Sequence, residues 1–245
     1  MTTVHQGWID SGMRRIMILF LIALTALFLS ASYALAHNVT EGDAGYIQEI
    51  WGMNIIPFMY LGAKHMVTGY DHLLFLLGVI FFLFRTRDIL LYVSLFTLGH
   101  SLTLFFGVLG NIAVNPYLID AIIGISVVYK GFDNLGGFQR LFGFQPNTKA
   151  AVLIFGLFHG FGLATKLQDF ALPEQDLWKN LLAFNIGVEI GQFLALLFIL
   201  IALNFWRRFN SFYSFSVVSN TLLMTGGFIL FGYQMTGYVL NVQQL

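Results

Sequence analysis

The stretch HMVTGYDHLLFLLGVIFF, residues 65–82, decides how this chain must be interpreted. It opens a long apolar run, yet it carries His65, Asp71 and His72 at or near its start. An ionisable side chain inside a bilayer is unfavourable by roughly 3 kcal/mol or more, so such residues are functional candidates by default. Imidazoles and carboxylates placed in this way predict that the protein handles a metal ion or protons within the membrane.

The composition identifies an integral membrane protein. Of its 245 residues, 58% are hydrophobic and only 10% are charged, and the mean hydropathy is +0.77. Soluble domains carry about 25% charged residues. The formal net charge is zero, so nothing indicates a nucleic-acid partner. Because the chain has no cysteine, a metal would be bound by nitrogen and oxygen atoms, which suits nickel, cobalt, zinc or copper(II) better than copper(I).

The N-terminus has the features of a bacterial secretory signal. Arg14 and Arg15 precede a short apolar run, and residues 34–36, Ala-Leu-Ala, form an A-x-A cleavage site before polar residues. We therefore predict a signal peptide over residues 1–36, so that the mature chain begins at His37. The alternative is a retained signal-anchor helix.

The remainder predicts an all-α fold, a polytopic bundle of about six transmembrane helices. A span needs about 20 mainly apolar residues. The predicted spans are 67–84, 89–110, 117–135, 150–167, 178–204 and 213–240. They make up a transmembrane domain over 67–245, which follows a periplasmic or interfacial segment over 37–66. Within that segment, 47–63 is apolar but contains Asn54, Pro57 and Gly62, so an interfacial or re-entrant helix is expected there.

Basic residues predict the orientation, because cytoplasmic loops are enriched in Lys and Arg. Seven basic residues fall on one side of the predicted spans: Arg85, Arg87, Lys130, Arg140, Lys149, Arg207 and Arg208. The other side holds Lys64, Lys166 and Lys179. The first side is therefore predicted to be cytoplasmic, in a bacterial inner membrane, with a periplasmic mature N-terminus. This orientation would place His65, Asp71 and His72 near the outer mouth.

The spacing of His65 and His72 restricts how the two residues can act together. On an unbroken helix, residues seven apart share a face but lie roughly 10 Å apart along the axis. A single metal ion about 2.1 Å from each ring nitrogen cannot bridge that distance. Either Gly69 marks an unwound stretch that brings the two rings together, or the two residues belong to successive sites. Asp71 could bind a metal directly or orient a histidine.

Three further ionisable residues lie deeper in the predicted spans, namely His100, His159 and Glu189. The polar residues expected to line a pathway or support the ligands are Thr97, Ser101, Thr103, Tyr129, Asn185 and Gln192. Asn185 and Gln192 lie four residues before and three residues after Glu189, which predicts one polar stripe on that helix. The simpler alternatives are histidines hydrogen-bonded to neighbouring carbonyls and glycines that serve only helix packing.

Five strings of residues in this order resemble the HupE/UreJ family of hydrogenase- and urease-associated membrane proteins, particularly its second branch. They occupy 69–75 (GYDHLLF), 96–103 (FTLGHSLT), 125–129 (ISVVY), 155–162 (FGLFHGFG) and 184–192 (FNIGVEIGQ). The resemblance implies a polytopic permease for nickel, or for cobalt, that supplies metalloenzyme maturation. The family's H-x5-D-H motif falls on His65, Asp71 and His72.

Three functions agree with these observations. The leading hypothesis is a divalent-cation permease, with nickel, cobalt or zinc as substrate or bound ion at His65, Asp71, His72, His100, His159 and Glu189. The second is an intramembrane zinc-dependent hydrolase that uses Glu189 as its base. The third is a non-transporting assembly or metal-delivery subunit. We expect a transporter rather than an enzyme, with the lipid bilayer and metalloenzyme accessory proteins as partners, and a homo-oligomer is compatible with the sequence.

Overall fold

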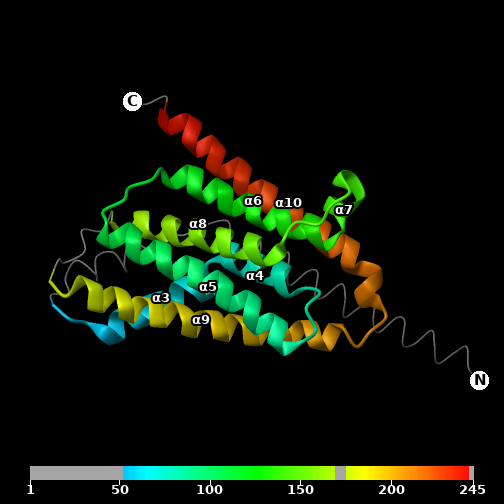
Figure 1. The fold of residues 1–245 in the computed structure, drawn as a ribbon, viewed down its shortest axis with the longest axis horizontal. Helices are drawn as coiled ribbons and strands as arrows, with labels where there is room; N and C mark the ends of the chain where they lie inside the picture. Colours follow the sequence, from blue (N-terminus) through cyan, green and yellow to red (C-terminus); the bar gives the residue numbers. More distant parts are fainter. Residues whose placement is uncertain (1–51, 169–174, 243–245) are drawn as a thin grey trace, which may run out of the picture. The chain divides into compact units, whose positions relative to one another are not determined.

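The computed structural model describes residues 52–168 and 175–242, and every regular element in these ranges is an α-helix (Figure 1). The predicted all-α fold is therefore confirmed. The predicted signal peptide over 1–36 lies outside the described residues. The described helices are α3 (Ile55–Thr68), α4 (Tyr70–Ile80), α5 (Thr86–Leu109), α6 (Pro116–Asn134), α7 (Gly137–Phe142), α8 (Thr148–Gln168), α9 (Leu177–Trp206) and α10 (Ser211–Val242).

Four of the described helices are long and apolar enough to cross a bilayer, namely α5, α8, α9 and α10. The predicted count of about six spans is not confirmed. The helix α6 runs through the bundle, but it carries Asp120, Lys130 and Asp133. The first predicted span, 67–84, is interrupted at Gly69, and the 11 residues of α4 extend only about 16 Å.

A helix was expected over 47–63, and the structure describes one, α3, that continues beyond this range to Thr68. It starts at Ile55 and packs along α9, so residue 67 lies near its end rather than at the start of a span. Pro57, one of the residues behind that expectation, occupies the first turn of α3, where its missing N–H has no helical partner to lose. Gly62 is a packing position, because a Cβ atom there would overlap the Phe184 carbonyl oxygen of α9.

Glycines bring three pairs of helices into close contact: α3 with α9, α5 with α8, and α6 with α10. In the α5–α8 pair, a Cβ atom at Gly156 would overlap the carbonyl oxygen of Phe96. One turn further along, a Cβ atom at Gly160 would overlap the carbonyl oxygen of His100 and the hydroxyl of Thr103. Small residues allow this backbone approach in membrane helices. The contact places the middle of α5 directly against the middle of α8.

Charged residues in α6 and the adjoining helix ends are paired. The Lys130 ammonium lies 2.6 Å from Asp133, which also accepts a hydrogen bond from Gln145. At the other end of α6, Asp120 lies 2.7 Å from the ammonium of Lys166 on α8. An unpaired charged side chain inside the bilayer is energetically unfavourable, and each ion pair reduces this cost. The paired groups explain how α6 tolerates three charges.

Arg207 holds the end of α4 against the end of α9. Its guanidinium donates hydrogen bonds of 2.6 and 2.7 Å to the carbonyl oxygens of Ile80 and Phe81, and it lies 4.5 Å from the Phe84 ring centroid. Burial lowers the pKa of this guanidinium from its usual range. The cation satisfies C-terminal carbonyl groups of a short helix, which are otherwise without intrahelical partners. The position of α4 is therefore fixed at this end.

Replacement of Gly187 by Ala tests the close contact between α3 and α9. An added Cβ atom would overlap the Met59 carbonyl oxygen, so the helices must separate. We expect the free energy of unfolding to fall by about 1–3 kcal/mol, observed as a lower unfolding temperature of the purified protein in detergent. Gly232→Ala on α10 is the matched control, because nothing lies within 4 Å of the added atom. Equal unfolding temperatures for the two variants would contradict the packing described here.

Candidate metal centre

Four histidines from four different helices meet inside the bundle. His65 comes from α3, His72 from α4, His100 from α5 and His159 from α8. His65 is 9% exposed, His72 is 1% exposed, and His100 and His159 are fully buried. Such burial of four imidazoles at one place is unusual for residues that have only a packing role.

The break at Gly69 brings the two histidines of the H-x5-D-H motif together. Gly69 has an extended conformation, with ψ of 97°, and it ends α3 and begins α4. The ring centroids of His65 and His72 are consequently 5.0 Å apart, whereas a straight helix would separate the residues by about 10 Å. The structure therefore has the first of the two arrangements left open by the sequence. A Cβ atom at position 69 would lie 2.8 Å from Nδ1 of His72, so a larger residue here would displace the His72 ring.

His65, His72 and His100 have the geometry of a nearly formed metal site. Each offers one ring nitrogen, and these three atoms lie within 4.8 Å of one another. Two nitrogens that each lie about 2.1 Å from one metal ion cannot be further apart than about 4.2 Å. The rings therefore need to close by less than about 1 Å to bind the same ion.

His159 completes the group beside His72. Their ring centroids are 5.0 Å apart. The Nδ1 atom of His159 lies 2.7 Å from the carbonyl oxygen of Phe155, one turn earlier in α8. A carbonyl oxygen can only accept, so Nδ1 carries the proton and donates, and Nε2 is the nitrogen that a metal would use. His159 thus lies at the edge of the three-histidine group, with Nε2 as the ring nitrogen that could serve as a further ligand.

Asp71 contacts His72 and holds its imidazole ring in place. Its Oδ1 atom accepts a hydrogen bond of 2.8 Å from the backbone N–H of His72 and lies 3.0 Å from the ring atom Nδ1. Asp71 is 1% exposed. A carboxylate bound to one imidazole nitrogen fixes the tautomer and increases the basicity of the other nitrogen. Asp71 therefore prepares Nε2 of His72 to bind a cation.

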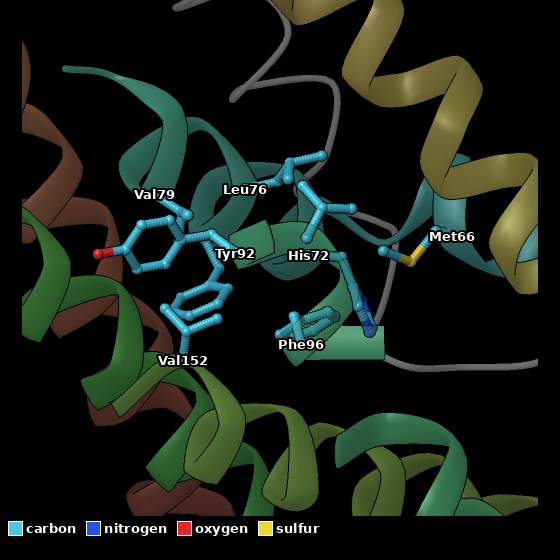
Figure 2. Close-up of a pocket in the computed structure, with 9 residues that line it drawn as sticks. Met66, His72, Leu76, Val79, Tyr92, Phe96 and Val152 are labelled. Carbon is cyan, nitrogen blue, oxygen red and sulfur yellow. The ribbon is translucent and has the colours of Figure 1, made fainter. Parts of the chain in front are cut away.

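A small apolar cavity adjoins His72 (Figure 2). It has room for about one water molecule. Figure 2 shows His72 at one side of this cavity and Tyr92 at the other. The lining residues come from α3, α4, α5 and α8, and they are Met66, His72, Phe75, Leu76, Val79, Tyr92, Val93, Phe96 and Val152.

The polar residues predicted to support the ligands connect the helices around the histidines. Thr97 donates a hydrogen bond of 3.0 Å to Gln192, and Ser101 donates one of 2.9 Å to Asn185, so both pairs join α5 to α9. Thr103 donates a hydrogen bond of 2.7 Å to the Leu157 carbonyl oxygen and joins α5 to α8. These contacts hold the helices that carry His100 and His159.

Tyr129 lies further along the bundle. Its ring packs 5.2 Å from that of Phe155 and 4.9 Å from that of Phe138, measured between centroids. Its buried hydroxyl has no hydrogen-bond partner among the described residues. Tyr129 is therefore separated from the histidines by Phe155.

Glu189 does not join the histidines. It is exposed on α9, in a stripe with the exposed apolar residues Ile186, Ile190 and Phe193. Two contacts fix the rotation of α9 about its own axis. Its glycine face packs on α3, and its edge with Asn185 and Gln192 packs on α5. Glu189 lies beyond that edge, so the predicted single polar stripe is divided between a buried edge and an exposed face.

The structure does not divide the histidines into an outer and an inner set. His65, Asp71 and His72 were expected near the outer mouth, with His100 and His159 deeper. The H-x5-D-H motif instead lies at the junction of α3 and α4, beside His100 and His159, which lie near the middle of α5 and α8. The histidines form one cluster and not two successive sites.

Sequence reasoning missed the phenylalanines beside the cluster. Phe75 lies three residues after His72, and Phe96 and Phe155 lie four residues before His100 and His159. Since α4 runs in the direction opposite to α5 and α8, all three rings lie one turn from a histidine toward the same end of the bundle (Figure 1). The spacing of three or four residues between each phenylalanine and a histidine is visible in the sequence. That the three rings lie on the same side of the histidines follows only from the directions of the helices.

A family model described as HupE / UreJ protein matches residues 41–242 of the chain. No curated protein and no solved structure matches it.

Replacement of Asp71 by Asn tests the role given to this carboxylate. The variant keeps the shape of the side chain but removes the negative charge beside Nδ1 of His72. We expect the affinity for nickel(II), measured by calorimetric titration in detergent, to fall about 10–100-fold.

Glu189→Gln is the matched control, because it also converts a carboxylate to an amide but lies outside the cluster. Its affinity should equal that of the unaltered protein. A larger loss in Glu189→Gln than in Asp71→Asn would contradict the assignment of these two residues.

Proposed function

The chain belongs to the HupE/UreJ family, and we propose that it is a permease that carries a divalent transition metal ion across the bilayer. Its apolar helices and its family indicate a membrane protein with a metal-related accessory function. Nickel or cobalt, delivered for metalloenzyme maturation, is the proposed substrate, and zinc is the alternative with similar ligand preferences.

The observation that carries this proposal is the convergence of His65, His72 and His100, with His159 adjacent, near the middle of the helices. A site at this depth can be reached from either side if the surrounding helices move, as transport requires. Ligands from four separate helices also couple binding to helix movement.

The donor set supports a late divalent metal. Neutral imidazole nitrogens suit nickel, cobalt, zinc and copper(II), whereas magnesium and calcium prefer oxygen ligands. Phe96 packs against the His72 and His159 rings, and the adjoining cavity is lined mainly by apolar side chains, so a bound cation would exchange water for imidazole nitrogens. Such a site discriminates by ligand chemistry and geometry rather than by net charge.

The proposed direction is uptake into a bacterial cytoplasm. The connections between α4 and α5, α6 and α8, and α9 and α10 lie at one end of the bundle (Figure 1). Arg85, Arg140 and Arg207 belong to these connections, so the positive-inside rule favours a cytoplasmic location for this end. The mature N-terminus would then be periplasmic.

The hydrolase hypothesis has less support, because it required Glu189 as the base. In the structure this residue lies on the exposed face of α9, away from the histidines. The metal-delivery hypothesis uses the same binding site without a route through the protein. Transport in a purified system distinguishes it from the permease.

Purified protein in proteoliposomes should take up radioactive nickel(II) along its gradient. His72→Gln should abolish this uptake, because the amide cannot replace an imidazole nitrogen that Asp71 prepares for binding. The variant must elute as the unaltered protein does in gel filtration, so that misfolding does not explain the result.

Glu189→Gln should transport at the normal rate and serves as the control. Tight nickel binding by the unaltered protein with no uptake into vesicles would contradict the permease and favour a metal-delivery subunit.

A further inference from the structure

A layer of phenylalanine rings lies directly beside the histidines, toward the end of the bundle that contains Arg207. Phe75, Phe96 and Phe155 each lie one helical turn from a histidine of their own helix. The centroid of Phe75 lies 5.3 Å from that of Phe96 and 5.8 Å from that of Phe155. The three rings therefore form one contiguous group, which we call the phenylalanine layer.

The layer touches the imidazoles on its other side. The centroid of His159 lies 5.0 Å from that of Phe96 and 5.4 Å from that of Phe75. Phe75 is 2% exposed and Phe96 is 5% exposed, so no solvent lies between these rings. A cation that leaves His159 toward this end meets the rings of Phe75 and Phe96 first.

Polar groups follow again beyond the layer. Tyr129 packs 5.2 Å from Phe155, and its buried hydroxyl has no hydrogen-bond partner among the described residues. Lys130 follows Tyr129 in α6, and its ion-pair partner Asp133 lies one turn beyond Tyr129. The order along the bundle is thus imidazole nitrogens, the phenylalanine layer, the Tyr129 hydroxyl and the Lys130–Asp133 ion pair.

The small cavity borders the layer. Phe75 and Phe96 line it together with Val152 and Tyr92 (Figure 2). Protein interiors are close-packed, so a void beside two aromatic rings removes contacts that would otherwise hold those rings in place. The void gives Phe75 and Phe96 room to tilt without displacing the backbone of α5 or α8.

We propose that the phenylalanine layer is the inner gate of the permease, and that the cavity beside Val152 gives its rings room for the first small tilt when the gate opens. This proposal rests on the proposed transport function. A closed apolar layer excludes water and makes passage of a divalent cation unfavourable. Bound metal waits at the histidines until ring movement opens a path to the Tyr129 hydroxyl.

The cavity can be filled or enlarged by one small change at Val152, which is 1% exposed. Val152→Ile adds a methylene group to a space that holds about one water molecule, and Val152→Ala removes two methyl groups. We expect Val152→Ile to slow nickel uptake in proteoliposomes about tenfold and Val152→Ala to accelerate it. Both variants should bind nickel with unchanged stoichiometry and affinity, because neither alters a ligand.

Val217→Ile and Val217→Ala are the matched controls, because this valine is 60% exposed on α10. They should transport at the normal rate. Unchanged uptake in both Val152 variants, with nickel binding retained, would overturn the gate and leave the permease intact. Slower uptake in Val152→Ala would also overturn it. If the unaltered protein transports no nickel, both the permease and the gate are wrong.

Discussion

The break in the helix at Gly69 is the constraint on which the site depends. Without it, His65 and His72 would face the same side of one helix at a separation of about 10 Å and could not bind the same metal ion. With it, their ring centroids are 5.0 Å apart. The break also starts a new helix whose first turn contains Asp71, next to the imidazole that this carboxylate orients. One glycine thus creates both the ligand pair and its support.

The other helices of the bundle place further histidines and polar side chains around that break. Close glycine contacts press α5 on α8, which sets His100 and His159 beside His72. Other glycines press α3 on α9, while hydrogen bonds from Thr97 and Ser101 join α5 to α9. At these glycines one helix backbone packs directly against another, so the helices that carry the histidines have little freedom to move apart. A cation can therefore be bound with small rearrangements.

Much of this architecture could be predicted from the sequence, for physical reasons that also explain the failures. Hydropathy predicted membrane helices, and the reach of a metal ligand predicted that Gly69 must be a break or the histidines must be separate. The face of α9 on which Glu189 lies could not be predicted. The rotation of this helix depends jointly on the packing of Gly187 and Gly191 on α3 and on the hydrogen bonds of Asn185 and Gln192 with α5. The phenylalanine layer likewise required knowing that α4 opposes α5 in direction.

The central claim is that one divalent metal ion binds to imidazole nitrogens contributed by different helices. X-ray absorption spectroscopy of the nickel-loaded protein tests it most directly. The account predicts a first shell with at least three imidazole nitrogens about 2.0–2.1 Å from the metal, and loss of this signature in His100→Gln. A shell made mainly of oxygen atoms, unchanged in that variant, would contradict it.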